Sequence, residues 1–382
     1  MLTECPQRAA VLFKRSLLAK EVDSEPLKFS LDLRQSVEDR ERAIICFYKA
    51  NTTNWARPLR CWLEGDAAVG EGVNRHVLNL TVHTLQTGFH VNYGNGDVTI
   101  LFEGQQDHLV PCASQLLLDS DLFLMAGRIL GHSVLHGGPV LVGLCPAVVC
   151  VLLGDKPDAT TITLDDVPDM DLRKIIASLE GQADLSEEEQ SAVKQLAESW
   201  EIGRQFLTEQ TRHWLFHRLL QHAVLGRAAQ QIVQLRKGIK QTGVWPLLST
   251  KKATDRLMFP RLADVAISPE TILDRIIWPV EKPMEEEEDE PYSLEIRCTV
   301  AGYLCQFIET ASQKSLRALL RFWTGWEVPT EDLHMEVVHG SHPRSSTCFQ
   351  SLKLPGNYDN YALFSLSLES CISTCDTGFG LV

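Results

Sequence analysis

Apolar residues recur every three or four positions over much of the first 245 residues, and this spacing predicts helices. Residues 73–85 show the spacing clearly. Residues 122–135 and 146–153 are apolar almost throughout, which predicts two buried helices. Residues 160–245 are mainly helical in pattern, whereas the alternation of apolar and polar residues over 59–64 predicts a strand.

Two local patterns refine this region. Ser186 followed by Glu189 is typical of a capping box, in which each side chain bonds the backbone of the other residue. A later helix carries one apolar face, made of Leu225, Ile232, Leu235 and Ile239. Upstream, residues 90–100 predict a β-hairpin whose glycine-rich turn lies at 94–96.

An acidic run divides the pattern. Residues 285–290 are six consecutive acidic residues between two prolines, and such a block repels itself and stays solvated. We therefore predict a hinge there and an α+β protein of two lobes. The expected parts are a leader of unknown role at 1–30, a large, mainly helical lobe at 31–284, the hinge at 285–290 and a small α/β lobe at 291–382.

The small lobe mixes both kinds of element. Residues 296–308 and 315–320 predict helices, and strands are expected at residues 320–323, 335–338 and 349–354. A closing helix follows, with Asp359 as its candidate N-cap. Its apolar face consists of Tyr361, Phe364, Leu368 and Ile372.

Composition narrows the possible partners. The 382 residues carry a net charge of -14, and no basic stripe offsets it, which argues against a nucleic-acid or anionic-membrane partner. Charges interrupt the N-terminal segment where a signal peptide would be apolar. The most apolar run, residues 139–153, is too short to span a bilayer.

The cysteines point to a reducing compartment. There are 11 of them, an odd number without any Cys-x-x-Cys pair, so neither a disulfide framework nor a zinc motif is indicated. We expect a cytoplasmic or nuclear protein in which most cysteines are small buried apolar residues.

Other chemical patterns are weaker. His132 with His136, and His213 with His217, each place two imidazoles on one helical face, but no third ligand is evident. Residues 65–72 are glycine-rich yet lack the Lys of a phosphate loop, and no Gly-x-Ser-x-Gly is present. We expect no metal and no cofactor. The tryptophans are read as core anchors rather than base-stacking platforms: Trp214, Trp245 and Trp278.

Five ordered motifs in the last lobe resemble the C-lobe of HECT ubiquitin ligases. The chain reads Leu-Arg-Phe-Trp-Thr-Gly at 320–325, with Pro329 after it, like the family's Phe-x-Thr-Gly. Residues 343–349 end in Thr347-Cys348-Phe, like the loop of the family nucleophile. Leu-x-Leu-Pro at 352–355 and the closing helix follow, and Phe379 lies fourth from the end, as the family's tail phenylalanine does.

The match to the family's N-lobe is thinner. Gly70-x-Gly72-Val-x-Arg75 is similar to the glycine pair and arginine that open a long helix. Residues 123–128, with a later Gly-Pro at 138–139, and residues 234–238 are similar to two further N-lobe motifs. The resemblance covers residues 55–382, and its closest branch is the small vertebrate HECT-like group found beside PHD zinc fingers.

This resemblance implies a ubiquitin-protein transferase. Cys348 would accept ubiquitin as a thioester from a ubiquitin-conjugating enzyme and pass it to a lysine of a protein substrate. A thiolate on an exposed loop meets the chemical need, and a nearby cation or hydrogen-bond donor would favour it. Arg344 and His342 are candidates for that help, with Thr347 and Phe379 as supporting residues.

Three departures keep a second hypothesis open. The family's histidine before Thr-Cys is Ser346 here, and the chain ends at Val382 where many relatives end in an acidic residue. The docking region for the conjugating enzyme, residues 160–210, is reduced to a short helical stretch. The alternative is a catalytically inactive HECT-like scaffold for protein interactions. A papain-like hydrolase is a distant third, because no histidine follows His342.

Overall fold

A computed structural model describes most of the chain. The described residues are 6–49, 54–65, 70–93, 98–180, 184–202, 209–249, 255–280, 291–325, 327, 332–347 and 350–373. The chain mixes helices with small sheets, in keeping with the expected α+β class. Within the described residues, no helix is both long and apolar enough to cross a bilayer.

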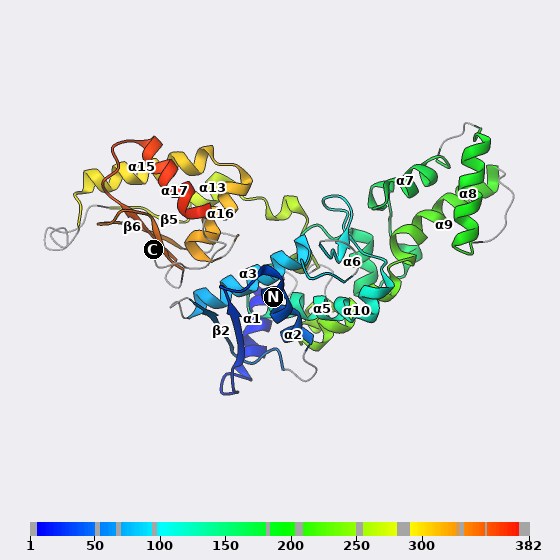
Figure 1. The fold of residues 1–382 in the computed structure, drawn as a ribbon, viewed down its shortest axis with the longest axis horizontal. Helices are drawn as coiled ribbons and strands as arrows, with labels where there is room; N and C mark the ends of the chain where they lie inside the picture. The colour runs from blue at the N-terminus through cyan, green and yellow to red at the C-terminus, as the bar shows by residue number, and fades with distance from the viewer. Residues whose placement is uncertain are drawn as a thin grey trace.

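Two hydrophobic cores organise the molecule. The larger runs from Leu27 to Phe259 and defines the N-terminal unit; the smaller runs from Ile267 to Ile372 and defines the C-terminal unit. In Figure 1 the C-terminal unit lies on the left of the N-terminal unit, and a helical arm projects on the right.

A β-α-β unit begins the larger core. Strands β1 (Leu27–Asp32) and β2 (Leu59–Glu64) pair in parallel, with Leu27 opposite Leu59, and α2 (Val37–Lys49) connects them. Every second residue of each strand is buried, as a strand with one covered face requires. The expected strand at 59–64 is confirmed. Leu27, Phe29 and Leu31 of β1 are buried in this core, so position 30 falls inside a strand of the N-terminal unit.

Helices make up the rest of the central body. The expected helices at 73–85, 122–135 and 146–153 are confirmed, the last two at their predicted bounds. The body contains α1 (Pro6–Ala19), α3 (Glu71–Thr87), α4 (Gln115–Asp119), α5 (Leu122–Leu135), α6 (Pro146–Leu153), α10 (Ala229–Gln241), α11 (Trp245–Ser249) and α12 (Asp255–Met258). Short strands and turns complete it: β3 (Phe102–Glu103), β4 (Val110–Pro111), η1 (Pro157–Ala159), η2 (Leu164–Asp166) and η5 (Leu262–Val265).

Glycines bring α5 and α10 into close contact. A methyl group at Gly127 would overlap the Leu235 carbonyl oxygen, and one at Gly238 would overlap the Leu124 carbonyl oxygen. The helices therefore meet backbone to backbone, which only glycine allows at these positions. Two of the N-lobe-like motifs, residues 123–128 and 234–238, thus lie face to face.

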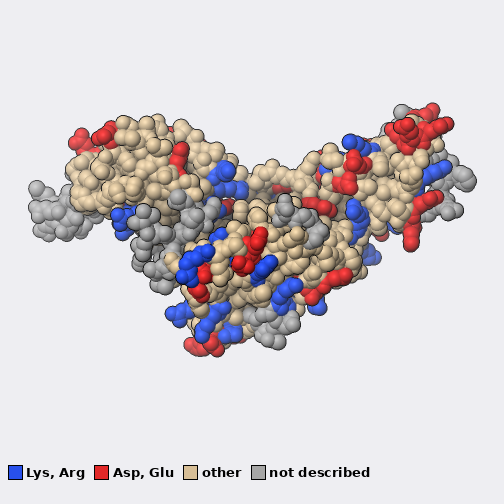
Figure 2. Space-filling model, viewed as in Figure 1, with Lys and Arg blue, Asp and Glu red and all other residues tan. Residues whose placement is uncertain are grey.

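The arm consists of α7 (Met170–Ala177), α8 (Glu187–Ser199) and α9 (Glu209–Gln221), joined to the body by η3 (His222–Gly226) (Figure 1). The capping box is confirmed: the Ser186 N–H donates to Glu189 at 2.8 Å and the Glu189 N–H donates to Ser186 Oγ at 3.2 Å. Figure 2 shows acidic side chains gathered at the tip of the arm, where α8 begins with Glu187, Glu188 and Glu189.

The C-terminal unit packs helices against a four-stranded sheet. The strand order is β5-β6-β8-β7, parallel except for β7. Its strands are β5 (Ile276–Ile277), β6 (Leu333–Val338), β7 (Arg344–Ser346) and β8 (Ser351–Pro355). Its helices are α13 (Pro269–Leu273), α15 (Leu294–Thr310), α16 (Gln313–Thr324) and α17 (Tyr361–Ser373).

Two local expectations in this unit are wrong. Residues 320–323 are not a strand but the last turn of α16, because Leu316, Leu319, Leu320 and Trp323 share one buried helical face. Asp359 does not cap α17; the Asn360 side chain does so, accepting a hydrogen bond from the Leu363 N–H at 3.1 Å. The expected helices at 296–308 and 315–320 and the strand at 335–338 are confirmed, and β8 overlaps the expected 349–354 strand but ends one residue later.

The expected hinge does not separate the two cores. Strand β5, which precedes the acidic run, pairs with β6, and Ile267, Ile272 and Ile276 are buried in the smaller core. The division between the cores therefore falls between Phe259 and Ile267. Residues 285–290 themselves lie outside the described residues, as do positions 94–96 of the expected hairpin, of which the Phe89–Thr99 bridge is described.

Candidate functional site

The loop singled out by the sequence connects β7 to β8 in the C-terminal unit. Ser346 pairs with Ser351, so four residues make the connection, and the Gln350 N–H donates to the Thr347 carbonyl oxygen at 3.4 Å. Cys348 lies between these two residues and, like Phe379, is outside the described residues. Thr347 and Gln350, on either side of it in the loop, are described.

Trp323 anchors one side of this loop. The indole is fully buried, and its Nε1–H donates to the carbonyl oxygens of Gln350 at 2.9 Å and His334 at 3.1 Å. The His334 N–H also donates to the Gln350 carbonyl oxygen at 2.9 Å. A buried indole needs a hydrogen-bond acceptor, and here the acceptors tie the end of α16 to the loop and to β6.

Arg75 contacts the other side, and it comes from the N-terminal unit. Its Nη1 donates to the Thr347 carbonyl oxygen at 3.0 Å and to the Thr324 carbonyl oxygen at 3.3 Å. Thr347 is 6% exposed and Thr324 is fully buried. The partly buried guanidinium therefore bonds the carbonyl oxygen of the residue that precedes Cys348 in the sequence.

The candidates chosen from the sequence are less close. Arg344 is exposed on β7 and pairs with Lys353, about 10 Å of strand from Thr347 at ~3.3 Å per residue. His342 is exposed in the turn before β7. Sequence reasoning assigned the supporting cation to these neighbours and missed Arg75. The Gly-x-Gly-x-x-Arg motif at 70–75 was the signal in the sequence that could have indicated Arg75, because the helix that it begins lies next to this loop.

The buried Cys145 has a setting that disfavours a thiolate. None of the eight cysteines that the structure describes forms a disulfide. Cys145 donates to Asp166 Oδ1 at 3.3 Å, and His108 Nδ1 lies 2.7 Å from the same oxygen. The carboxylate, not the imidazole, faces the thiol, so this cluster lacks the order of a Cys-His-Asp triad. Burial above all, together with the Asp166 charge, raises the pKa of Cys145 to about 12.

The histidine pairs have structural explanations or too few ligands. His132 Nδ1 lies 2.9 Å from the Tyr48 hydroxyl, and His136 Nε2 donates to the Trp55 carbonyl oxygen at 2.8 Å. Burial lowers the pKa of both imidazoles, which keeps them neutral. His213 and His217 are exposed with their Nε2 atoms 3.1 Å apart. Over the described part of the chain, no group of three metal-ligating side chains occurs.

The expected role of one tryptophan is wrong. Trp214 is 40% exposed on α9, so it does not anchor the core; Trp245 and Trp278 are half-buried, and Lys240 Nζ lies 4.8 Å from the Trp245 ring centre. The helix of Trp214 belongs to the projecting arm, which has too few neighbours to cover both of its faces (Figure 1).

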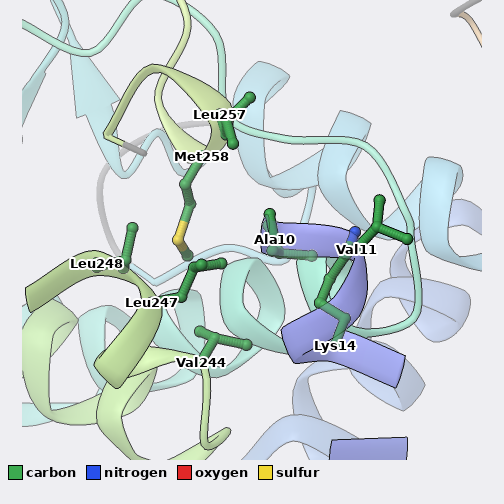
Figure 3. A pocket seen from close by; sticks show the side chains of 9 residues that line it. Ala10, Val11, Lys14, Val244, Leu247, Leu248, Leu257 and Met258 are labelled. Atoms are coloured by element: carbon green, nitrogen blue, oxygen red, sulfur yellow. The ribbon is translucent and has the colours of Figure 1, made fainter. Parts of the chain in front are cut away.

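Cavities are found next to the site and away from it. One of about 390 Å³ lies beside Arg75, between the end of α1 and the start of α3, and includes Glu71 and Asn74. A smaller one, about 190 Å³, is lined by apolar side chains of α1, α11 and α12, with Lys14 extending along α1 beside Val11 (Figure 3). Burial lowers the pKa of Lys14.

Comparison with known families identifies the class of the C-terminal unit. Residues 286–382 match the family described as HECT-domain (ubiquitin-transferase). The matched part of the chain includes the anchored loop and Cys348, so the comparison supports a HECT domain in this part. No curated protein matches the chain.

Proposed function

We propose that the chain is a HECT-type ubiquitin-protein ligase with Cys348 as its nucleophile. The observation that carries the proposal is the HECT match over 286–382 together with the Thr-Cys dipeptide in a loop that Trp323 and Arg75 hold from both sides. The N-terminal unit would act as the N-lobe of a bilobal arrangement. A cytoplasmic or nuclear location and the partners ubiquitin, a conjugating enzyme and a protein substrate belong to the same proposal.

The chemistry needs two balanced steps. In the first, the Cys348 thiolate attacks the thioester carbonyl of ubiquitin on the conjugating enzyme; a new C–S bond forms, and the donor cysteine leaves as a thiolate. In the second, a substrate lysine amine attacks the Cys348 thioester. The isopeptide bond forms, the amine loses a proton, and Cys348 leaves as a thiolate.

The arm is the candidate docking site for the conjugating enzyme. It falls within residues 160–210 and the rest of α9, carries exposed Met170 and Trp214, and has an acidic tip at α8. Exposed large apolar side chains are typical of interaction surfaces. The arm is helical over its described length, so the mixed α/β unit of larger relatives is absent there.

A second candidate function is an inactive HECT-like scaffold. Ser346 stands where relatives carry a histidine, and the helical arm is a reduced docking region. Both features would allow the protein to bind partners without accepting ubiquitin.

A single-turnover transfer assay decides between the two. Conjugating enzymes loaded with ubiquitin are mixed with the wild-type protein and with Cys348→Ala, and the products are separated without reductant. We expect a reductant-sensitive adduct that Cys348→Ala abolishes. Cys298→Ala, which removes an exposed thiol of the same unit, is the matched control and should retain the adduct. No adduct from folded wild-type protein with any donor would favour the scaffold.

A further inference from the structure

Arg75 connects the two units at a place where their backbones almost touch. It lies on α3, in the N-terminal unit, and both carbonyl oxygens that accept from its Nη1 belong to the C-terminal unit. A methyl group built on Gly325 would lie 3.4 Å from the Gly72 carbonyl oxygen and 3.5 Å from Arg75 Cβ. The start of α3 and the end of α16 are therefore in van der Waals contact, and the positive φ of Gly325, 80°, is the conformation that favours glycine at this helix end.

The two acceptors suit a cation. Thr324 is the last residue of α16, and the final carbonyls of a helix carry partial negative charge without partners inside the helix. Thr347 is the first residue of the β7–β8 turn. One guanidinium therefore fixes both the end of a helix and the start of the loop, which a point-charge donor such as lysine does less well.

This contact holds the loop far from the arm. In Figure 1 the C-terminal unit and the arm lie at opposite ends of the molecule, with the N-terminal body between them. If the conjugating enzyme docks on the arm, the C-terminal unit must leave α3 before Cys348 can meet the donor thioester.

We propose that Arg75 is a clasp that restrains the C-terminal unit against α3 and so limits how often Cys348 can accept ubiquitin. The expected effect on ubiquitin acceptance rests on the proposed function, whereas the restraint of the C-terminal unit by Arg75 does not. A protein that reacts only from its released state reacts at a rate set by the released fraction. Loss of a charged, two-acceptor hydrogen-bond group should raise that fraction roughly tenfold.

The test compares wild type with Arg75→Ala and Arg75→Lys, each first shown to unfold cooperatively. Hydrogen exchange is measured on peptides covering 70–78 and 320–325, and thioester formation on Cys348 is measured in single turnover. We expect Arg75→Ala to exchange faster at both peptides and to accept ubiquitin up to about tenfold faster, with Arg75→Lys in between. Arg15→Ala, an exposed arginine of α1, should match wild type in both readouts.

Each other outcome has a definite meaning. Unchanged exchange in both Arg75 variants would overturn the clasp. Faster exchange with unchanged or slower acceptance would overturn the restraint, since release would then not limit the reaction. Faster exchange in a protein that never forms the thioester would leave the clasp in place and reject the proposed function instead.

Discussion

At the residue scale, burial decides which titratable groups are chemically active. His132 lies among Phe47, Tyr48 and Trp55, and its pKa is well below 6.5 because burial, and then the neighbouring His136, disfavour its charged form. Cys61 and Cys145 have pKa values of about 12 for the same main reason. Burial therefore favours the neutral forms of these groups.

The buried imidazoles predict a loss of stability in mild acid. The folded-state pKa of His132 lies below the unfolded value of 6.5, so its contribution is fully present above that value. As pH falls below about 6.5, the unfolded chain binds protons that the folded chain does not bind, and the free energy of unfolding decreases. His136 and His222, whose pKa values are also lowered, add in the same direction.

Urea unfolding at about pH 7.5, 6.5 and 5.5 measures this effect. One proton contributes up to roughly 1.4 kcal/mol per pH unit. His132→Gln should be less stable than wild type at neutral pH but should lose less stability per pH unit in acid. Equal slopes for the two proteins would show that His132 does not account for the effect.

At the element scale, the pairing of α5 with α10 sets the shape of the central body. The helices touch through Gly127 and Gly238, and Gly131 lies against the Thr242 side chain just past the end of α10. Arg128 donates to Gln241 Oε1 of α10 and to the Tyr48 carbonyl oxygen of α2, each at 2.7 Å. Side chains larger than hydrogen would push the helices apart.

We expect Gly127→Ala to destabilise the protein although alanine favours helices. The added methyl overlaps the backbone of α10, and overpacking of this kind costs about 1–3 kcal/mol. Gly302→Ala is the matched control: it lies within α15 with open space around the added methyl, so it should stabilise by about 0.5–1 kcal/mol. Thermal unfolding of both variants checks this, and a neutral Gly127→Ala would contradict the packing argument.

At the scale of the whole molecule, the boundary between the cores lies before the acidic run. Helix α13 and strand β5 precede that run, yet they belong to the smaller core. The acidic run is therefore an insertion between two parts of one unit, and the boundary between the cores falls within residues 260–266.

This boundary predicts the behaviour of fragments. Residues 262–382 should fold cooperatively, whereas residues 291–382 should be less stable by roughly 4 kcal/mol or more. The shorter fragment loses Ile267, Ile272 and Ile276, and burial of each such side chain contributes about 1.5–3 kcal/mol. Circular dichroism during urea unfolding compares the two. Equal urea midpoints for the two fragments would indicate that the boundary between the units lies at the acidic run.

The sequence by itself determined the elements with a strong period and the identity of the loop. The helices at 122–135 and 146–153, the strand at 59–64 and the capping box at Ser186 depend on neighbours within a few residues, so local patterns suffice to predict them. The ordered motifs around Thr347 and Cys348 gave the HECT resemblance for the same reason, because a short motif can be read from adjacent residues without knowledge of the fold.

Only the tertiary structure decided what depends on distant contacts. The assignment of β5 to the smaller core rests on its pairing with β6, more than 50 positions away, and no local pattern records such a partner. Residues 320–323 became helix because burial of Leu316, Leu319 and Trp323 on one face outweighed the local alternation. Arg75 reaches Thr347 across 272 positions of sequence, and a hydrogen bond of that kind exists only once the two units have packed together.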